Sequence, residues 1–322
     1  MNRWNNILAS LALALPLVAV SAPALAAGGV WLQPQALPAG ARATLQQAVN
    51  VEKLRNPSAF EAVAQIKGCT LAGYSQSRLG QPLCGRELRV GKSEWLLPLL
   101  SALALQEPRG ADGHVPYATA EEKHAFAVGA IEAVGLLRDS RAREVLHAAF
   151  AAATSQQMAD NAAEALGRLG GDRELGTLVS ASRSGSTLVA ALRGLGECKR
   201  IEAAKAIAAG LSAAKTPAHV AAWANAAGRV ASSWAWQAIA RQTPSRIAEA
   251  QDVRTVAARS LAEALVVTTD ADAVEELVQS LQMTEYAGAP ALLAELRSKA
   301  DAAGQARLAL ASQRFADYVK RK

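Results

Sequence analysis

The sequence predicts an all-α protein, an α-α superhelix in which antiparallel helix pairs stack into a solenoid. Two observations carry this prediction: the kind of apolar residue in the chain and the recurrence of one helical pattern. Hydrophobic residues make up 51% of the 322 residues, whereas aromatic residues make up 4%. Much of the apolar content is alanine, which is the best helix former and has little volume. A core of alanine and leucine favours closely packed helices over a sheet of β-branched and aromatic residues.

The recurring pattern is a first helix, a short turn and a second helix. The first helix carries closely spaced alanines with Leu or Val at i and i+3 or i+4. Aligning the ends of five such helices gives steps of 32, 26, 35 and 34 residues, the signature of a repeat array. The predicted first helices contain residues 127–137, 161–170, 188–196, 221–230 and 253–264. The predicted second helices contain residues 141–152, 173–182, 200–211 and 271–281.

Local residues predict where several of these helices begin and end. Thr119 with Glu122 has the spacing of a capping box, in which each residue satisfies a free amide of the other. Asp172 and Asp270 are expected to cap second helices, because a short acidic side chain accepts the first free N–H groups. Glycines that follow the first helices suit helix C-termini, since glycine accepts a positive φ.

The second unit, residues 162–170, reads Ala-x-x-Ala-Leu-Gly-x-Leu-Gly and is followed by a turn and a second helix. This pattern resembles the HEAT-like repeats first noted in phycobilin lyases, and the resemblance covers residues 119–282. It implies a curved solenoid that binds other proteins along a concave surface lined by the second helices. No catalytic residue is carried over from the few relatives that are enzymes.

The chain divides into four predicted segments. Residues 1–26 form a signal peptide, 27–118 an N-terminal helical cap with a stapled loop, 119–282 the repeats, and 283–322 the C-terminal capping helices. Terminal units of a solenoid differ from the middle because their outer faces meet water.

The first segment has the three parts of a secretory signal. A polar start with Arg3 precedes the apolar stretch Ile7–Val20, and small residues precede a predicted cleavage after Ala26. We therefore expect a periplasmic or secreted protein; an uncleaved membrane anchor is the alternative. No second long apolar segment follows, so no membrane span is expected in the mature chain.

Cysteine usage agrees with export. Cys69 and Cys84 bracket a segment rich in Gly, Ser and Gln, and a disulfide between them is predicted to stabilise the fold by about 3 kcal/mol. The alternative is that both thiols are free or bind a metal, but two thiols without a nearby His make a poor zinc site. Cys198 lies between helical patterns and is expected to be a buried small hydrophobe.

Charge and motifs point away from nucleic acid and from catalysis. The formal charge is +6, of which Arg3 contributes one, and acids alternate with bases along the chain. That pattern is typical of a solvated surface rather than of the basic face of a nucleic-acid binder. Gly91-Lys92-Ser93 lacks the earlier glycine of a phosphate loop, and the four His lack metalloprotease spacing. No catalytic residue, metal or cofactor is predicted.

Three tryptophans are the candidate partner contact. Trp223, Trp234 and Trp236 lie within fourteen residues, and tryptophan is favoured at binding hot spots. Trp223 also fits the core register, and Trp234 and Trp236 cannot share one helix face, so one of them is expected to be partly exposed.

The sequence therefore predicts an exported, non-catalytic scaffold or adaptor that binds protein partners. Two alternatives stay open. One is an enzyme with an unrecognised site, in a pocket where the Cys69–Cys84 segment and the loop 107–118 meet a helix end. The other is a module that binds an anionic glycan or a lipid headgroup on a basic stripe.

Overall fold

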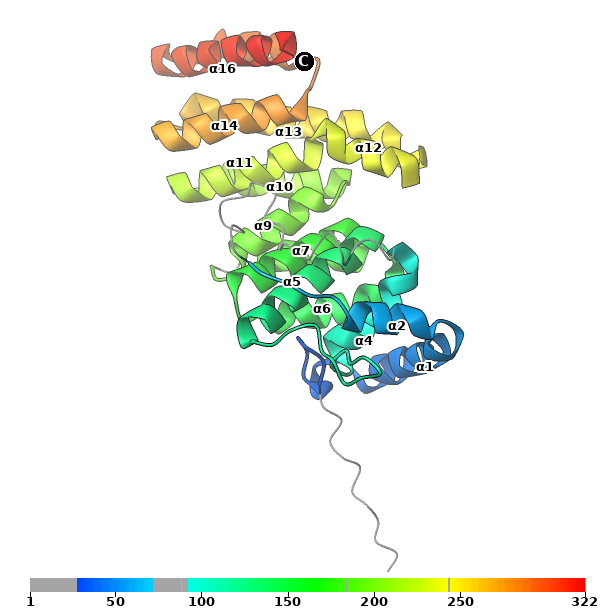
Figure 1. Cartoon of the computed structure of the whole chain (residues 1–322). Helices are drawn as coiled ribbons and strands as arrows, with labels where there is room; N and C mark the ends of the chain where they lie inside the picture. The colour runs from blue at the N-terminus through cyan, green and yellow to red at the C-terminus, as the bar shows by residue number, and fades with distance from the viewer. Residues whose placement is uncertain (1–27, 72–87, 89–91, 184, 243, 322) are drawn as a thin grey trace, which may run out of the picture.

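The computed structural model describes residues 28–71, 88, 92–183, 185–242 and 244–321. These residues form helices and connecting turns, with no β-strand among them, so the predicted all-α class is confirmed. The helices stack along one axis from α1 at one end to α16 at the other (Figure 1). The α-helices are α1 (Ala39–Arg55), α2 (Pro57–Ala64), α4 (Leu96–Ala104), α5 (Ala120–Leu137), α6 (Arg143–Ala151), α7 (Gln156–Leu169), α8 (Asp172–Ala181), α9 (Leu188–Glu197), α10 (Ile201–Ala213), α11 (Pro217–Ala231), α12 (Ser233–Gln242), α13 (Glu249–Val267), α14 (Ala271–Thr284), α15 (Ala289–Arg297) and α16 (Ala302–Lys320).

The middle of the chain forms two layers of helices. In what we call the first layer, α5, α7, α9 and α11 pack directly on one another in chain order. The second layer holds α6, α8 and α10. Of these, α6 and α8 pack mainly against the first-layer helices α7 and α9. This arrangement is the predicted solenoid of antiparallel helix pairs.

The order of the layers reverses after α11, which the repeat pattern did not predict. Helix α13, expected as a first helix, packs along α10 in the second layer. Helix α14, expected as a second helix, packs along α11 in the first layer. The cause lies in residues 233–248, where α12 and a 3-10 helix (Pro244–Ala248) follow α11 and lead the chain into the second layer before it returns to the first.

The helix starts follow local chemistry. Thr119 and Glu122 form the predicted capping box, and Asp270 accepts from the amide of Ala273 at the start of α14. The prediction that Asp172 caps the second helix is wrong. Asp172 is the first residue of α8, and Gly171 occupies the cap position. Its carboxylate instead accepts from Arg200 Nη1 at 2.6 Å in the next repeat.

Glycines inside the first-layer helices let the backbones touch. A Cβ placed on Gly167 of α7 would clash with the carbonyl oxygen of Gly194 in α9, and one on Gly194 would clash with the carbonyl oxygen of Ala163. Glycine removes the side chain that would keep the two helices apart. Of the glycines named here, only Gly170 ends a helix as the sequence predicted: it follows α7 with φ +64°.

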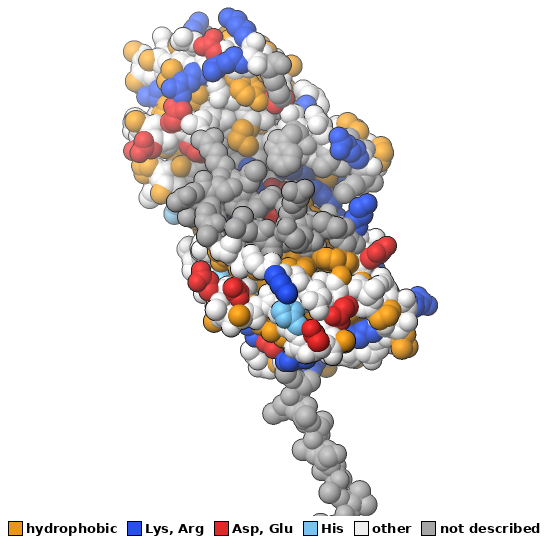
Figure 2. Space-filling model, in the orientation of Figure 1, with side chains coloured by type: hydrophobic (Ala, Val, Ile, Leu, Met, Phe, Trp, Pro, Cys, Tyr) orange, Lys and Arg blue, Asp and Glu red, His pale blue; other side chains and the backbone are white. Residues whose placement is uncertain are grey.

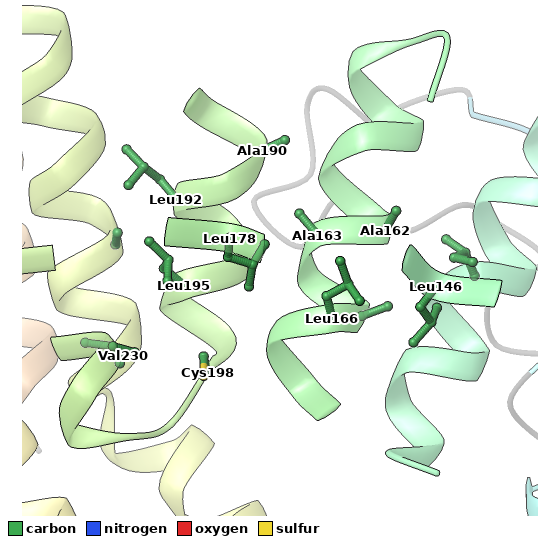
Figure 3. Close-up of a cluster of buried hydrophobic side chains, with 14 of the residues drawn as sticks. Leu146, Ala162, Ala163, Leu166, Leu178, Ala190, Leu192, Leu195, Cys198 and Val230 are labelled. Carbon is green, nitrogen blue, oxygen red and sulfur yellow. The ribbon is translucent and has the colours of Figure 1, made fainter. Parts of the chain in front are cut away.

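Alanines and leucines fill the space between the layers. Figure 3 shows Ala163 and Leu166 of α7 lying between Leu146 of α6 on one side and Leu178 of α8 and Leu195 of α9 on the other. All five side chains are fully buried. Because alanine is small, helices of this kind can approach closely and still leave no gap.

Both ends of the stack are closed by additional packing. At the N-terminal end, the amides of Val30 and Leu32 donate to the carbonyls of Ala102 and Leu103 at 2.8 and 2.9 Å. These hydrogen bonds hold residues 30–32, which precede α1, against α4. At the C-terminal end, the two predicted closing helices are α15 and α16. Within the described ranges, none of the helices has the length and apolarity that a membrane crossing requires.

Candidate functional site

An open hollow of about 690 Å³ lies between α6 and α8. Its lining combines an aromatic ring, small side chains, three hydroxyls and one cation, from two consecutive repeats and the segment before α9. Nothing in the sequence pattern singled these residues out, because they come together only when the repeats stack. The lining residues are Phe150, Ala151, Arg173, Gly176, Thr177, Ser180, Ala181 and Thr187.

Small residues on α8 create the hollow. A Cβ on Gly176 would meet no atom of the described residues within 4 Å, so the helix face there is open. Beyond the end of α8, Thr187 Oγ1 donates to the carbonyl of Ala181 at 2.9 Å, which holds the segment before α9 at the edge of the hollow.

A buried charge cluster lies beside the hollow and contacts Thr177 of its lining. The side chain of Glu174 is 0% exposed, and its Oε1 accepts from Arg143 Nε at 2.6 Å. His147 Nε2 lies 3.3 Å from the same oxygen, and His147 Nδ1 lies 3.4 Å from Thr177 Oγ1. Gly171 makes room for the cluster, since a Cβ there would clash with Glu174 Oε2.

Protonation states in the cluster follow from burial and from the neighbouring charges. Burial opposes ionisation of Glu174, but Arg143, a backbone hydrogen bond and His147 together lower its pKa. Burial lowers the pKa of His147, and the charge of Arg173 adds to this, while Glu174 offsets part of it. A neutral His147 donates from Nε2 to the Glu174 carboxylate, so its Nδ1 accepts from the Thr177 hydroxyl.

The order carboxylate, imidazole, hydroxyl is that of a nucleophilic site, but its surroundings favour a binding role. The closest partner of Glu174 is Arg143, not His147. Thr177 lies inside α8, whose amides bond along the helix, so this helix offers no free donors for a developing oxyanion. The chain of hydrogen bonds instead fixes the Thr177 hydroxyl at the edge of the hollow.

A second charge cluster crosses the first layer. Arg229 Nη2 of α11 lies 2.9 Å from Glu164 Oε1 of α7 and 2.7 Å from Glu197 Oε1 of α9. Arg168 of α7 binds the same two acids at 3.0 and 3.4 Å. Burial opposes ionisation of Glu197, yet the charges of Lys199, Arg168 and Arg229 hold its pKa well below the usual range. This cluster joins three successive repeats and presents paired rather than free charges.

Two of the three tryptophans lie in the core. Trp223 is buried in the core, as its position in the helix pattern predicted, and a Cβ on Gly210 of α10 would clash with its ring. Trp236 is 4% exposed and its Nε1 donates to the carbonyl of Val230 at 3.0 Å. Both indoles fill gaps in an alanine-rich core, so neither offers an aromatic surface. The side chain of Trp234 lies outside the described parts of the chain.

Of the cysteines, the structure describes Cys69 and Cys198. Cys84 lies outside the described residues, so the Cys69–Cys84 disulfide stays a prediction. Cys198 is free and fully buried, as expected for a small hydrophobe, and burial raises the pKa of its thiol to about 11. Among the residues with described positions, no three His, Cys, Asp or Glu side chains gather as a metal site would require.

No protein-family model matches this chain, and no characterised protein is detectably similar to it in sequence. The likeness of residues 119–282 to HEAT-like repeats therefore stays a prediction. Function has to be inferred from the hollow and its neighbouring charges.

Proposed function

We propose that this protein is an exported, non-catalytic scaffold or adaptor, and that an extended segment of a protein partner binds in the hollow between α6 and α8. The observation that supports the proposal most is the open shape of the hollow in the second layer. A segment of chain can lie across such a surface, whereas small molecules favour sites that bury most of their area.

The lining suits a segment of mixed character. Phe150 and Ala151 offer an apolar contact, and Thr177, Ser180 and Thr187 offer hydroxyls that donate or accept. Arg173 is 53% exposed and pairs with the exposed Glu144. Exposed ion pairs are worth about 0–1 kcal/mol, so an acidic group of the partner could replace Glu144 at little cost. We therefore expect a segment that carries an apolar side chain near an acidic one.

Affinity capture from the native envelope fraction, with crosslinking and mass spectrometry, tests the proposal. Gly176→Trp places an indole in the hollow, and Gly40→Trp is the matched control, because Gly40 is also a helical glycine with open space around it. We expect one partner to crosslink near the hollow, and its recovery to fall about tenfold for Gly176→Trp, which corresponds to about 1.4 kcal/mol. The control should recover as much as the wild type.

Two results would contradict the proposal. Equal recovery with a folded Gly176→Trp variant would move the contact away from the hollow, with Trp234 as the next residue to substitute. No protein enriched over the background would overturn the scaffold function itself. The same fractions test export, since the intact mass of the purified chain should correspond to a start at Ala27.

A further inference from the structure

A second, smaller cavity lies in the N-terminal cap. It measures about 60 Å³ and is lined by residues of α1, α2 and α4 and of the loop after α4. Its polar lining consists of Lys53, Ser101, Gln106 and Arg109, and Phe60 and Pro98 contribute apolar walls. A water molecule occupies about 30 Å³ in the liquid, so the cavity has room for one group of a few heavy atoms.

Two cations line this cavity, and neither forms an ion pair with any described residue. Lys53 Nζ lies 5.4 Å from the centre of the Phe60 ring, a cation–π contact that holds the ammonium at the cavity wall. Arg109 donates from Nη1 to the carbonyl of Gly113 at 3.3 Å, which leaves most of its N–H groups for another acceptor.

The loop that carries Arg109 is built to a fixed shape. The amide of Gly110 donates to the carbonyl of His114 at 2.8 Å, and the amide of Gly113 donates back to Gly110 at 2.9 Å. Gly113 has φ +85°, a conformation that favours glycine. Glu61 of α2 accepts from the amide of Ala111 at 3.0 Å and so ties the loop to α2, the helix that also supplies Phe60.

Neither Glu61 nor Glu107 lines the cavity. Both Glu61 oxygens already have partners, since Oε2 binds the loop amide and Oε1 accepts from Gln65 Nε2 at 2.9 Å. Glu107 pairs with Lys123, which lowers the pKa of Glu107, and the charge of Arg109 lowers it further. The charge of Lys53 and Arg109 toward the cavity is therefore not neutralised by a carboxylate that lines it.

Ser101 adds a hydroxyl to the lining of the cavity. The residue is 2% exposed, and its carbonyl accepts from the amides of Leu105 and Gln106 at 2.9 and 3.0 Å. A hydroxyl both donates and accepts, so this one can bind an oxygen of a group inside the cavity.

We infer that this cavity binds an oxyanion group of the size of a carboxylate or a phosphate. Lysine and arginine only donate, and serine and glutamine can donate as well, so the polar lining matches a ligand with several acceptor oxygens. The inference is independent of the hollow between α6 and α8, from which the cavity is separated by its own set of helices.

The test is titration of the full mature chain with sodium phosphate and with sodium acetate, against sodium chloride at equal ionic strength. Binding is measured by calorimetry, and the rise in melting temperature is followed in parallel. We expect saturable binding of at least one of the two oxyanions. Lys53→Met with Arg109→Met should weaken it at least tenfold, and Ser101→Ala about threefold.

The matched control replaces two exposed cations elsewhere, Lys205→Met with Arg241→Met, which makes the same change in net charge. The control should bind as the wild type does. Absence of saturable binding to both ions would overturn the inference, and so would equal binding by the Lys53/Arg109 variant when circular dichroism shows that it is folded.

A second arm distinguishes a free ion from the end of a larger molecule. Short peptides with a free or an amidated C-terminus are titrated under the same conditions. Tighter binding of the free-acid peptide than of acetate assigns the site to a chain-terminal carboxylate. Binding of phosphate alone assigns it to a phosphate ion or phosphoryl group.

Discussion

The first and second helix layers use glycine in opposite ways. In the first layer, Gly167 of α7 faces the backbone of α9, and no side chain fits between the two helices. In the second layer, Gly176 of α8 faces open space and lines the hollow. The same residue type therefore joins repeats in one layer and opens a recess in the other. The difference suggests that the first layer holds the solenoid together and the second layer is available for binding.

Ion pairs in the molecule also range from buried to exposed. In the first layer, Arg229 is largely buried between Glu164 and Glu197, and these acids raise its pKa further above the usual value despite burial. In the second layer, the pair of Arg173 and Glu144 is exposed, whereas the neighbouring Glu174 is buried with Arg143 and His147. The space-filling view shows acidic and basic side chains interspersed on the face turned to the viewer (Figure 2), in line with the solvated surface expected from the sequence.

The largest expected effect comes from placing a side chain at the contact between α7 and α9. Gly167→Ala should lower the free energy of unfolding by about 4 kcal/mol, because the new Cβ would force the two backbones apart. Gly176→Ala is the matched control and should change stability by less than about 1 kcal/mol, in the stabilising direction, because alanine is the better helix former. Urea unfolding measures both. Similar losses in the two variants would remove the contrast between the layers.

The next effect comes from the charge clusters. Arg229→Met leaves Glu164 and Glu197 without one of their partners in a largely buried site, and we expect a loss of about 3 kcal/mol. Arg173→Met breaks the exposed pair and should cost at most about 1 kcal/mol. Melting temperatures at low and high salt separate the two cases, because salt screens the exposed pair more strongly. A small loss for Arg229→Met would show that the buried cluster adds little to the stack.

A smaller effect is expected at the buried Glu174 cluster beside the hollow. Gly171→Ala should displace the Glu174 carboxylate from Arg143 and His147, with a loss of about 2 kcal/mol. Gly185→Ala is a suitable control, since a Cβ there meets no described atom within 4 Å. The two variants are compared by urea unfolding. If the Gly171 variant is as stable as the control, the Glu174 cluster does not depend on the geometry seen here.

The smallest effect is a pH dependence of stability. Burial lowers the folded pKa of His147 and of His124, and an unfolded histidine titrates near 6.5. Above pH 6.5 both states are neutral. As the pH falls below 6.5, the unfolded chain binds protons first, so the free energy of unfolding decreases by at most about 1.4 kcal/mol per pH unit for each histidine. His147→Gln should reduce this slope between pH 6.5 and 5, and an unchanged slope would contradict the assignment.

Local features of the sequence account for much of the fold. The capping box at Thr119, the cap at Asp270 and the burial of Cys198 were all predicted, because each depends on a few neighbouring residues. The binding surfaces were not predictable in this way. The hollow joins residues of α6 and α8 that lie about one repeat apart, and the cavity joins Lys53 to Arg109 across more than fifty residues.

The sequence by itself determined that the described chain is all-helical, where some of its helices begin, and that they pair into a stack, because helix propensity and apolar spacing act within one or two turns. Only the tertiary structure decided which layer α13 and α14 join, that Gly167 serves contact between helices, and that the indole of Trp236 is buried. These outcomes depend on which helix surfaces pack together when the repeats stack. The same local sequence pattern is compatible with more than one such packing arrangement.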